Sequence, residues 1–122
     1  MSDASRDLTV VITHGIDHEL SSVALTIARG GMNAGMRVSL FLTSAGVDLV
    51  RRRGAELTHV PPLDPLKDLL SDILKRGGTV WACPPCTKTR GYEQADLVDG
   101  VVIAGAAGMH KLIAAGGATL CF

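Results

Sequence analysis

The chain has 122 residues, with 12 basic and 12 acidic side chains and a formal net charge of zero at pH 7. This balance and the low aromatic content of 3% exclude a polybasic or base-stacking nucleic-acid binder. The length predicts one domain over residues 1–122, with residues 1–6 as a flexible N-terminus. Because 47% of so small a chain is hydrophobic, we expect apolar surface buried between subunits of a homo-oligomer.

The sequence gives no sign of export or of a membrane span. The stretch MSDASRDLTV lacks the basic and apolar regions of a secretory signal, and the apolar runs fall short of the roughly 20 residues that cross a bilayer. Three cysteines in such a chain indicate a reducing compartment, where a C-x-x-C is more often chemical than structural. We therefore expect a cytoplasmic protein without membrane insertion.

The first half of the chain alternates strand and helix patterns. Leu8–His14 is a continuous apolar run, typical of a buried parallel strand. Asp17 is predicted to cap the following helix, whose apolar face recurs at helical spacing until Gly35 ends it. A second strand is expected at residues 38–43, and a short helix then closes at Gly54.

The second half continues the alternation. The clearest helix has Asp64 as its predicted cap, Pro65 in the first position and Gly77 at its end. A strand is expected next at residues 79–83, followed by a short helix after Pro84 and Pro85. A strand at residues 100–105, a helix at 109–115 and a last strand at 118–122 complete the chain. Five strands alternating with helices predict an α/β fold, a single three-layer domain around a mostly parallel five-stranded sheet.

A site in such a fold is expected outside the carboxyl ends of the strands. These ends carry His14-Gly15, Thr43-Ser44, Cys83 and Gly105. The stretch ACPPCTKTRGY, residues 82–92, thus stands where the fold places chemistry.

The two prolines in this stretch define its geometry. They disfavour helix before Pro85, which leaves Cys83 at or just before a helix N-terminus. The partial positive charge of that terminus lowers the pKa of a thiol, and Lys88 and Arg90 add positive charge nearby. We expect Cys83 to be a nucleophile, with Cys86 as a resolving or auxiliary thiol.

Other uses of these residues are weighed beside this one. Structural zinc is disfavoured because there is no second C-x-x-C and only His14 and His18 have metal-ligand spacing. No metal is therefore expected. A thioredoxin-type fold is disfavoured by the late position of the motif, although dithiol–disulfide chemistry stays open. His14 is expected more as a loop residue than as a catalytic one. Cys121 is expected in the core of the last strand.

Further expectations concern the surface, the core and the ligands. The run Arg51–Arg53 is expected on a solvated helix face, and Met109 in the core. A non-catalytic, oligomeric module that binds a nucleotide or small molecule beside the THGIDHE stretch is a further alternative. The shortage of aromatic residues argues against flavin, and no cofactor is expected.

Taken in order, four segments resemble the DsrE/DsrF-like family, which includes the sulfur-relay subunits of the DsrEFH and TusBCD complexes. The segments are VVITHGID, ALTIARGGMNAGMRVSLFLTSAGVDLV, ACPPCTKTRG and GVVIAGAAGMHKLIAAGGATLCF. The resemblance covers nearly the whole chain and implies a flavodoxin-like sheet and assembly into trimers or hexamers.

The resemblance also implies an activity. In relay subunits the reactive cysteine precedes an Arg-Gly pair by seven and eight positions, and Cys83 stands in that relation to Arg90 and Gly91. By resemblance, Cys83 accepts sulfane sulfur as a persulfide and passes it to a partner's thiol. His14, Arg90 and Gly91 are expected to support it. Cys86 departs from the single-cysteine pattern of many relay subunits and resembles stand-alone members, which leaves a dithiol reductase as the alternative.

Overall fold

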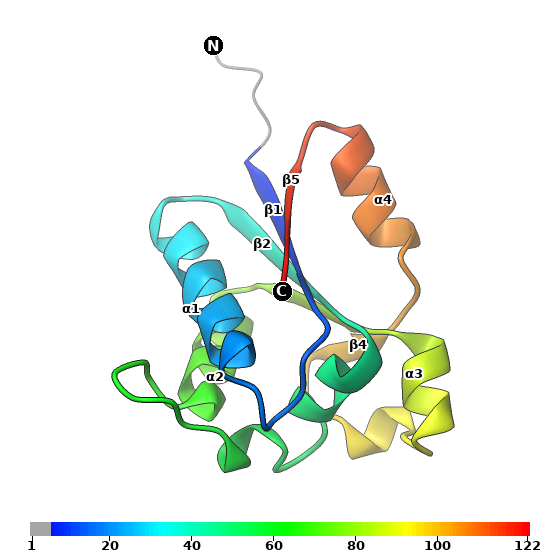
Figure 1. Ribbon diagram of the computed structural model, residues 1–122. Helices are drawn as coiled ribbons and strands as arrows, with labels where there is room; N and C mark the ends of the chain where they lie inside the picture. Colours follow the sequence, from blue (N-terminus) through cyan, green and yellow to red (C-terminus); the bar gives the residue numbers. More distant parts are fainter. Residues whose placement is uncertain (1–5) are drawn as a thin grey trace.

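A five-stranded, all-parallel sheet forms the centre of the molecule (Figure 1). The computed structural model describes residues 6–122, so residues 1–5 of the predicted flexible N-terminus lie outside the described part. The strand order is β4-β3-β2-β1-β5. The strands are β1 Asp7–Ile12, β2 Arg37–Leu42, β3 Thr79–Ala82, β4 Val101–Ile103 and β5 Ala118–Cys121. The predicted parallel α/β fold is confirmed.

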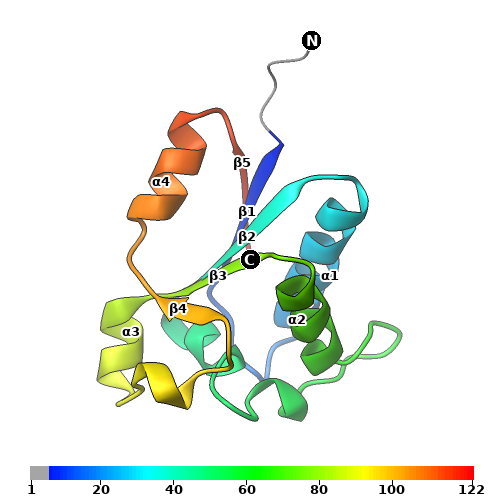
Figure 2. The same cartoon turned by 180° about the vertical axis from the view of Figure 1, so that it is seen from behind.

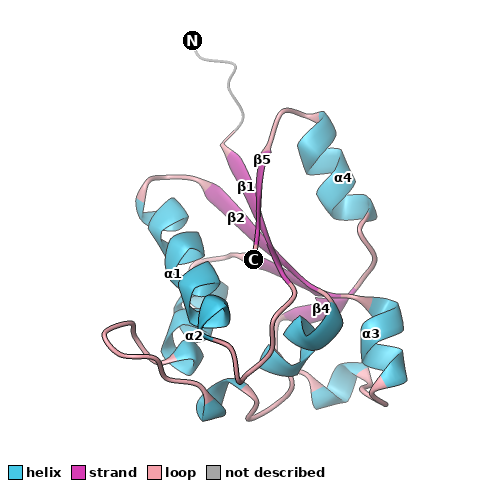
Figure 3. Cartoon of the chain, in the orientation of Figure 1, coloured by secondary structure: helices cyan, strands magenta, loops and turns pink. Residues whose placement is uncertain are grey.

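Helices cover both faces of this sheet, as expected for parallel strands joined by crossovers. Helices α1 (Glu19–Asn33) and α2 (Leu66–Lys75) pack together on one face, and α4 (Ala107–Ala114) lies on the other (Figures 1 and 2). The short helix α3 (Pro84–Thr89) follows β3 and lies beyond the carboxyl edge of the sheet (Figure 3).

The hydrophobic core lies between the sheet and the α1–α2 pair. Alternate residues of each strand point to this face, where Val10, Leu40 and Val80 are almost completely buried. Helix α2 contributes the apolar stripe that its sequence predicts, and Leu69 and Ile73 are fully buried. Full burial of each such side chain contributes roughly 1.5–3 kcal/mol, so this layer accounts for most of the apolar stabilisation.

The opposite face is thinly covered. Helix α4 has no buried residue, and none of residues 102–122 is buried although the segment is rich in apolar side chains. Trp81 contacts α4 so closely that a Cβ at Gly108 would lie 2.9 Å from its ring. The expectation that Cys121 and Met109 are core residues is wrong: Cys121 is exposed and Met109 only half-buried. Cys121 lies on an edge strand with β1 as its neighbour in the sheet.

Three local predictions are also corrected. The cap of α1 is His18, whose Nδ1 accepts a hydrogen bond from the amide of Leu20 at 3.1 Å, and not Asp17. The cap of α2 is Pro65, because the Asp64 carboxylate instead forms an ion pair with Arg29 of α1 at 2.8 Å.

The third correction concerns the segment after β2. The short helix predicted to close at Gly54 is instead a 3₁₀ turn, η1 (Ser44–Leu49), which ends at Leu49, and a second 3₁₀ turn, η2 (Ala55–Leu57), begins only after Gly54. A search of the part of the chain that the structure describes finds no helix long and apolar enough to cross a membrane.

Candidate active site at the carboxyl edge of the sheet

The C-x-x-C lies where neighbouring strands end. Helix α3 follows β3, and turn η1 follows the adjacent strand β2. The backbone of Cys83 is tied to β2 by its amide, which donates to the carbonyl of Leu42 at 2.8 Å. The two segments are therefore held side by side, as predicted from the strand ends.

Turn η1 is held tightly against the end of β1. The amide of Thr43 donates to the carbonyl of Ile12 at 3.0 Å. A Cβ at Gly46 would lie 2.3 Å from that same carbonyl oxygen, so only glycine fits there. Within the turn, Ser44 has a φ of 52°, a left-handed conformation that is uncommon for a residue other than glycine.

This backbone conformation accompanies a contact with Cys86. The amide of Ser44 donates a hydrogen bond to Cys86 Sγ at an N···S distance of 3.1 Å. The hydroxyl of Thr43 lies 3.5 Å from the same sulfur. Two polar groups on η1 and its preceding residue thus converge on one thiol, and a charged thiolate accepts such bonds more strongly than a thiol.

The surroundings of Cys83 are different. It is the N-cap of α3, as the prolines predict, but its side chain makes no capping hydrogen bond. Pro84 and Pro85 occupy the first two helical positions, and neither has an amide proton to donate. Cys86, in the third position, is the first residue of α3 with an amide proton, so this helix end offers a Cys83 thiolate fewer donors than usual.

The electrostatics of the pair favour an ionised Cys86. The hydrogen bond from Thr43 lowers the pKa of the Cys86 thiol, and the Ser44 amide, the Cys83 side chain and the charge of Arg90 lower it further, while burial raises it. Both cysteines are half-buried and neither forms a disulfide. A sulfur in this setting is a nucleophile that remains reachable from solvent.

Arg90 and Gly91 support the backbone of this site. Arg90 Nη1 donates to the carbonyl of Cys86 at 3.2 Å, and its Nε lies 3.4 Å from Asp48 of η1. Gly91 has a φ of 74°, which turns the chain after α3 and favours glycine. Tyr92 closes the arrangement by donating to Asp48 at 2.6 Å; burial and this hydrogen bond raise the pKa of Tyr92.

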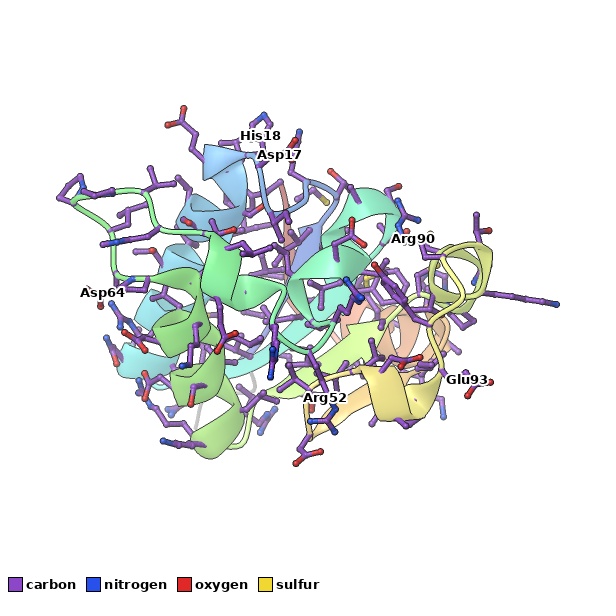
Figure 4. All side chains as sticks on the ribbon, turned by 90° about the horizontal axis from the view of Figure 1, so that it is seen from below. Asp17, His18, Arg52, Asp64, Arg90 and Glu93 are labelled. Carbon is purple, nitrogen blue, oxygen red and sulfur yellow. The ribbon has the colours of Figure 1, made fainter. Side chains whose placement is uncertain are left out.

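His14 is placed at the same edge but pairs with another ring. Its ring centroid lies 4.0 Å from that of His18, and its Nδ1 is buried without a hydrogen-bond partner. Among residues 6–122, no hydrogen bond joins His14 to either cysteine. Figure 4 looks onto this edge and shows His18 at the α1 side of the molecule and Arg90 at the α3 side. The supporting role of His14 stays a prediction.

Two further observations bear on ligands. Residues 6–122 contain no group of three or more His, Cys, Asp or Glu side chains placed to hold a metal ion. The run Arg51–Arg53 is exposed, as expected, but it lies in a bridge and a turn between η1 and η2 and not on a helix face. With Ile16 and Tyr92 it borders a pocket of about 430 Å³.

Sequence reasoning named the strand end at Thr43-Ser44 without assigning it a role. It did not identify Asp48 or Tyr92. The sequence did contain a signal for the position of Thr43-Ser44 beside Cys83, since the carboxyl ends of adjacent parallel strands meet at one edge of the sheet. The contacts of Asp48 depend on how η1 packs, which no local pattern reveals.

The fold and the site together define a class: a parallel α/β domain that presents a C-x-x-C thiol pair at the carboxyl edge of its sheet. The sequence comparison is more specific. Residues 6–122 match the DsrE/DsrF-like family, and the chain belongs to it.

Similar proteins support this placement. The uncharacterized proteins MK0008 of Methanopyrus kandleri and MJ0989 of Methanocaldococcus jannaschii are 34% and 35% identical to this chain. Each match covers 87% of this chain, and 83% and 88% of the respective relatives.

Solved structures share the fold at lower identity. The ychN protein from E. coli is 20% identical with a TM-score of 0.77, over 97% of this chain and 99% of its own. The protein MTH1491 from Methanobacterium thermoautotrophicum is 19% identical with a TM-score of 0.72, over 95% of this chain and 98% of its own.

Proposed function

We propose that the protein is a sulfur carrier of the sulfurtransferase type, which accepts sulfane sulfur as a cysteine persulfide and passes it to a partner thiol. The observation that carries this proposal is the half-buried thiol pair at the carboxyl edge, in which the amide of Ser44 donates to Cys86 Sγ. Membership of the DsrE/DsrF-like family, which includes sulfur-relay subunits, supports it.

The chemistry needs a thiolate that first a sulfur donor and then a sulfur acceptor can reach. The thiolate attacks the outer sulfur of a donor persulfide, so that a new S–S bond forms while the donor's S–S bond breaks and the donor leaves as a thiolate. An acceptor thiolate then repeats the same exchange. No electron is gained or lost overall, so neither flavin nor metal is needed.

The resemblance assigns the persulfide to Cys83, because it precedes Arg90 and Gly91 by seven and eight positions. This assignment stays a prediction. Arg90 contributes by bonding the carbonyl of Cys86 and by its positive charge, and Gly91 by the turn that follows α3.

A dithiol–disulfide redox protein is the second candidate, and the placement of the two thiols favours it. Cys83 is the N-cap of α3 and Cys86 lies in the first turn of the same helix, and the Cys83 side chain lowers the pKa of Cys86. Attack of one thiolate on a persulfide of the other would form a disulfide and release sulfide.

We also propose where and in what form the protein acts. A reducing compartment, the cytoplasm, would keep both thiols free. The sparsely covered face of the sheet favours a homo-oligomer, of trimer or hexamer size by family resemblance, because Val102, on that face, is 51% exposed and Ile113 of α4 is 42% exposed. Its partners would be sulfur donor and acceptor proteins or small persulfides.

Intact-protein mass spectrometry tests the carrier function. The reduced protein and a Cys83→Ala/Cys86→Ala double variant, both in a Cys121→Ser background that removes the exposed third thiol, are exposed to a small persulfide and desalted, and their masses are measured. We expect a gain of about one sulfur that the double variant lacks. A loss of about two hydrogens with no added sulfur would favour the redox protein instead, and equal sulfur gain by the double variant would refute both.

A further inference from the structure

We propose that Cys86, rather than Cys83, is the thiolate that makes the first attack on the sulfur donor, and that the Thr43–Ser44 turn is the anion hole that stabilises it. This inference rests on the proposed function of the pair as a sulfur carrier. It assigns the entry point of the sulfur and gives a role to two residues that lie outside the C-x-x-C motif.

The first argument is the direction of the Ser44 amide. Ser44 has a left-handed backbone with a φ of 52°, and its amide nitrogen, which donates the hydrogen bond, lies 3.1 Å from Cys86 Sγ. Non-glycine residues adopt this conformation only where the surrounding structure holds them in it, and such residues cluster at functional sites. Here the constraint comes from the packing of η1, since Gly46 lies directly against the carbonyl of Ile12.

The second argument is that the donors converge on Cys86 and not on Cys83. Thr43 Oγ1 lies 3.5 Å from Cys86 Sγ, on the same turn as the Ser44 amide. Cys83 makes no side-chain capping bond to α3, where Pro84 and Pro85 supply no amide proton. Cys86 Sγ therefore has two polar neighbours able to donate to a negative charge, whereas the side chain of Cys83 makes no capping hydrogen bond with the helix that follows it.

The third argument is the relation between the two thiols. The Cys83 side chain lowers the pKa of the Cys86 thiol, as does the positive charge of Arg90, whose Nη1 also donates to the carbonyl of Cys86 at 3.2 Å. The groups around the pair thus favour the ionised form of Cys86.

The proposed step is a balanced exchange. The Cys86 thiolate attacks the outer sulfur of a donor persulfide R–S–SH, giving Cys86–S–SH and R–S⁻, with the proton remaining on the transferred sulfur. The Thr43–Ser44 turn stabilises the negative charge on Cys86 before the attack and again when the sulfur departs. From Cys86 the sulfur moves to the thiolate of a partner or to that of Cys83. The spacing of Cys83 to Arg90 and Gly91 is the one that, by family resemblance, marks the persulfide-carrying cysteine.

The test separates the two cysteines in a Cys121→Ser background, which removes the exposed third thiol. Cys83→Ala and Cys86→Ala variants are exposed to a small persulfide, and their masses are followed over time by intact-protein mass spectrometry. We expect the Cys83→Ala variant to gain one sulfur and the Cys86→Ala variant to lose at least tenfold in initial loading rate. Loading that survives in Cys86→Ala and is lost in Cys83→Ala would overturn the proposal.

A second measurement distinguishes failure of this inference from failure of the carrier function. The unmodified pair is treated with limiting iodoacetamide at pH 7, and the labelled peptides are quantified by mass spectrometry. We expect label on Cys86 to exceed label on Cys83 by about tenfold. If the protein takes up no sulfur but this ratio holds, the carrier function fails and the thiolate assignment stands. Preferential labelling of Cys83 would refute the assignment whatever the loading result.

Discussion

Replacing Thr43 with Val removes one hydroxyl from the surroundings of Cys86 and keeps the shape of the side chain. Hydrogen bonds to charged groups contribute about 1.5–3 kcal/mol. The 3.5 Å separation from Cys86 Sγ and the partial exposure of the sulfur reduce this to about 1 kcal/mol. Since one pKa unit corresponds to about 1.36 kcal/mol, the midpoint of Cys86 ionisation is expected to rise by about 0.7 pH unit.

The sign follows from the direction of the pKa. The Thr43 hydroxyl lowers the pKa of Cys86, so the Cys86 thiolate of the unmodified protein persists to lower pH. Removal of the hydroxyl therefore moves the pH profile of Cys86 reactivity to higher pH. Below the midpoint, thiolate population falls about fivefold. The greater nucleophilicity of a more basic thiolate recovers part of this loss and leaves a roughly twofold decrease in rate.

The assay is the rate of Cys86 alkylation by iodoacetamide from pH 5 to 10, measured in a Cys83→Ser/Cys121→Ser background. Thr43→Ser is the matched control, because it keeps the hydroxyl and is expected to keep the midpoint within about 0.2 pH unit. An unchanged midpoint in Thr43→Val, or the same displacement in Thr43→Ser, would refute the reasoning that the hydroxyl stabilises the thiolate.

Three further changes test other parts of the argument. Gly46→Ala places a Cβ 2.3 Å from the carbonyl of Ile12 and should cost about 2 kcal/mol in urea unfolding; an unchanged unfolding midpoint would show that η1 can shift freely. Val102→Asp puts a charge on the exposed sheet face and should reduce the mass measured by light scattering from an oligomer to a monomer, whereas an unchanged mass would place the interface elsewhere. Cys83→Ser should suppress sulfide release from the loaded protein, measured by methylene blue formation, and release equal to the unmodified protein would exclude Cys83 as the resolving thiol.

Much of the fold could be predicted because its signals are local. Apolar runs, helical spacing and glycine stops identified five strands and the two long helices, and α2 follows its Leu and Ile spacing closely. Errors arose where a tertiary contact competed with the local signal. Asp64, a good capping residue, instead forms an ion pair with Arg29 of the neighbouring helix, and His18 rather than Asp17 caps α1.

The candidate site was predictable in position but not in its internal contacts. The end of β3 located Cys83, and the end of β2 located Thr43-Ser44. The hydrogen bond from Ser44 to Cys86 joins residues 42 positions apart. The left-handed backbone of Ser44 could not be predicted either, because a serine seldom adopts this conformation. The exposure of Cys121 was missed for a similar reason, since an apolar strand pattern does not say whether the strand lies at an edge.

The two roles weighed for the pair differ by which sulfur Cys83 attacks. Attack on the outer sulfur of Cys86–S–SH moves the sulfur to Cys83 and regenerates the Cys86 thiolate; attack on the inner sulfur gives a Cys83–Cys86 disulfide and HS⁻. Stabilisation of the leaving Cys86 thiolate by Ser44 and Thr43 favours the first reaction, because a better stabilised thiolate leaves faster. The Thr43–Ser44 turn therefore does more than activate the attacking sulfur. By favouring departure of Cys86 as a thiolate, it directs a C-x-x-C pair toward sulfur transfer and away from disulfide formation.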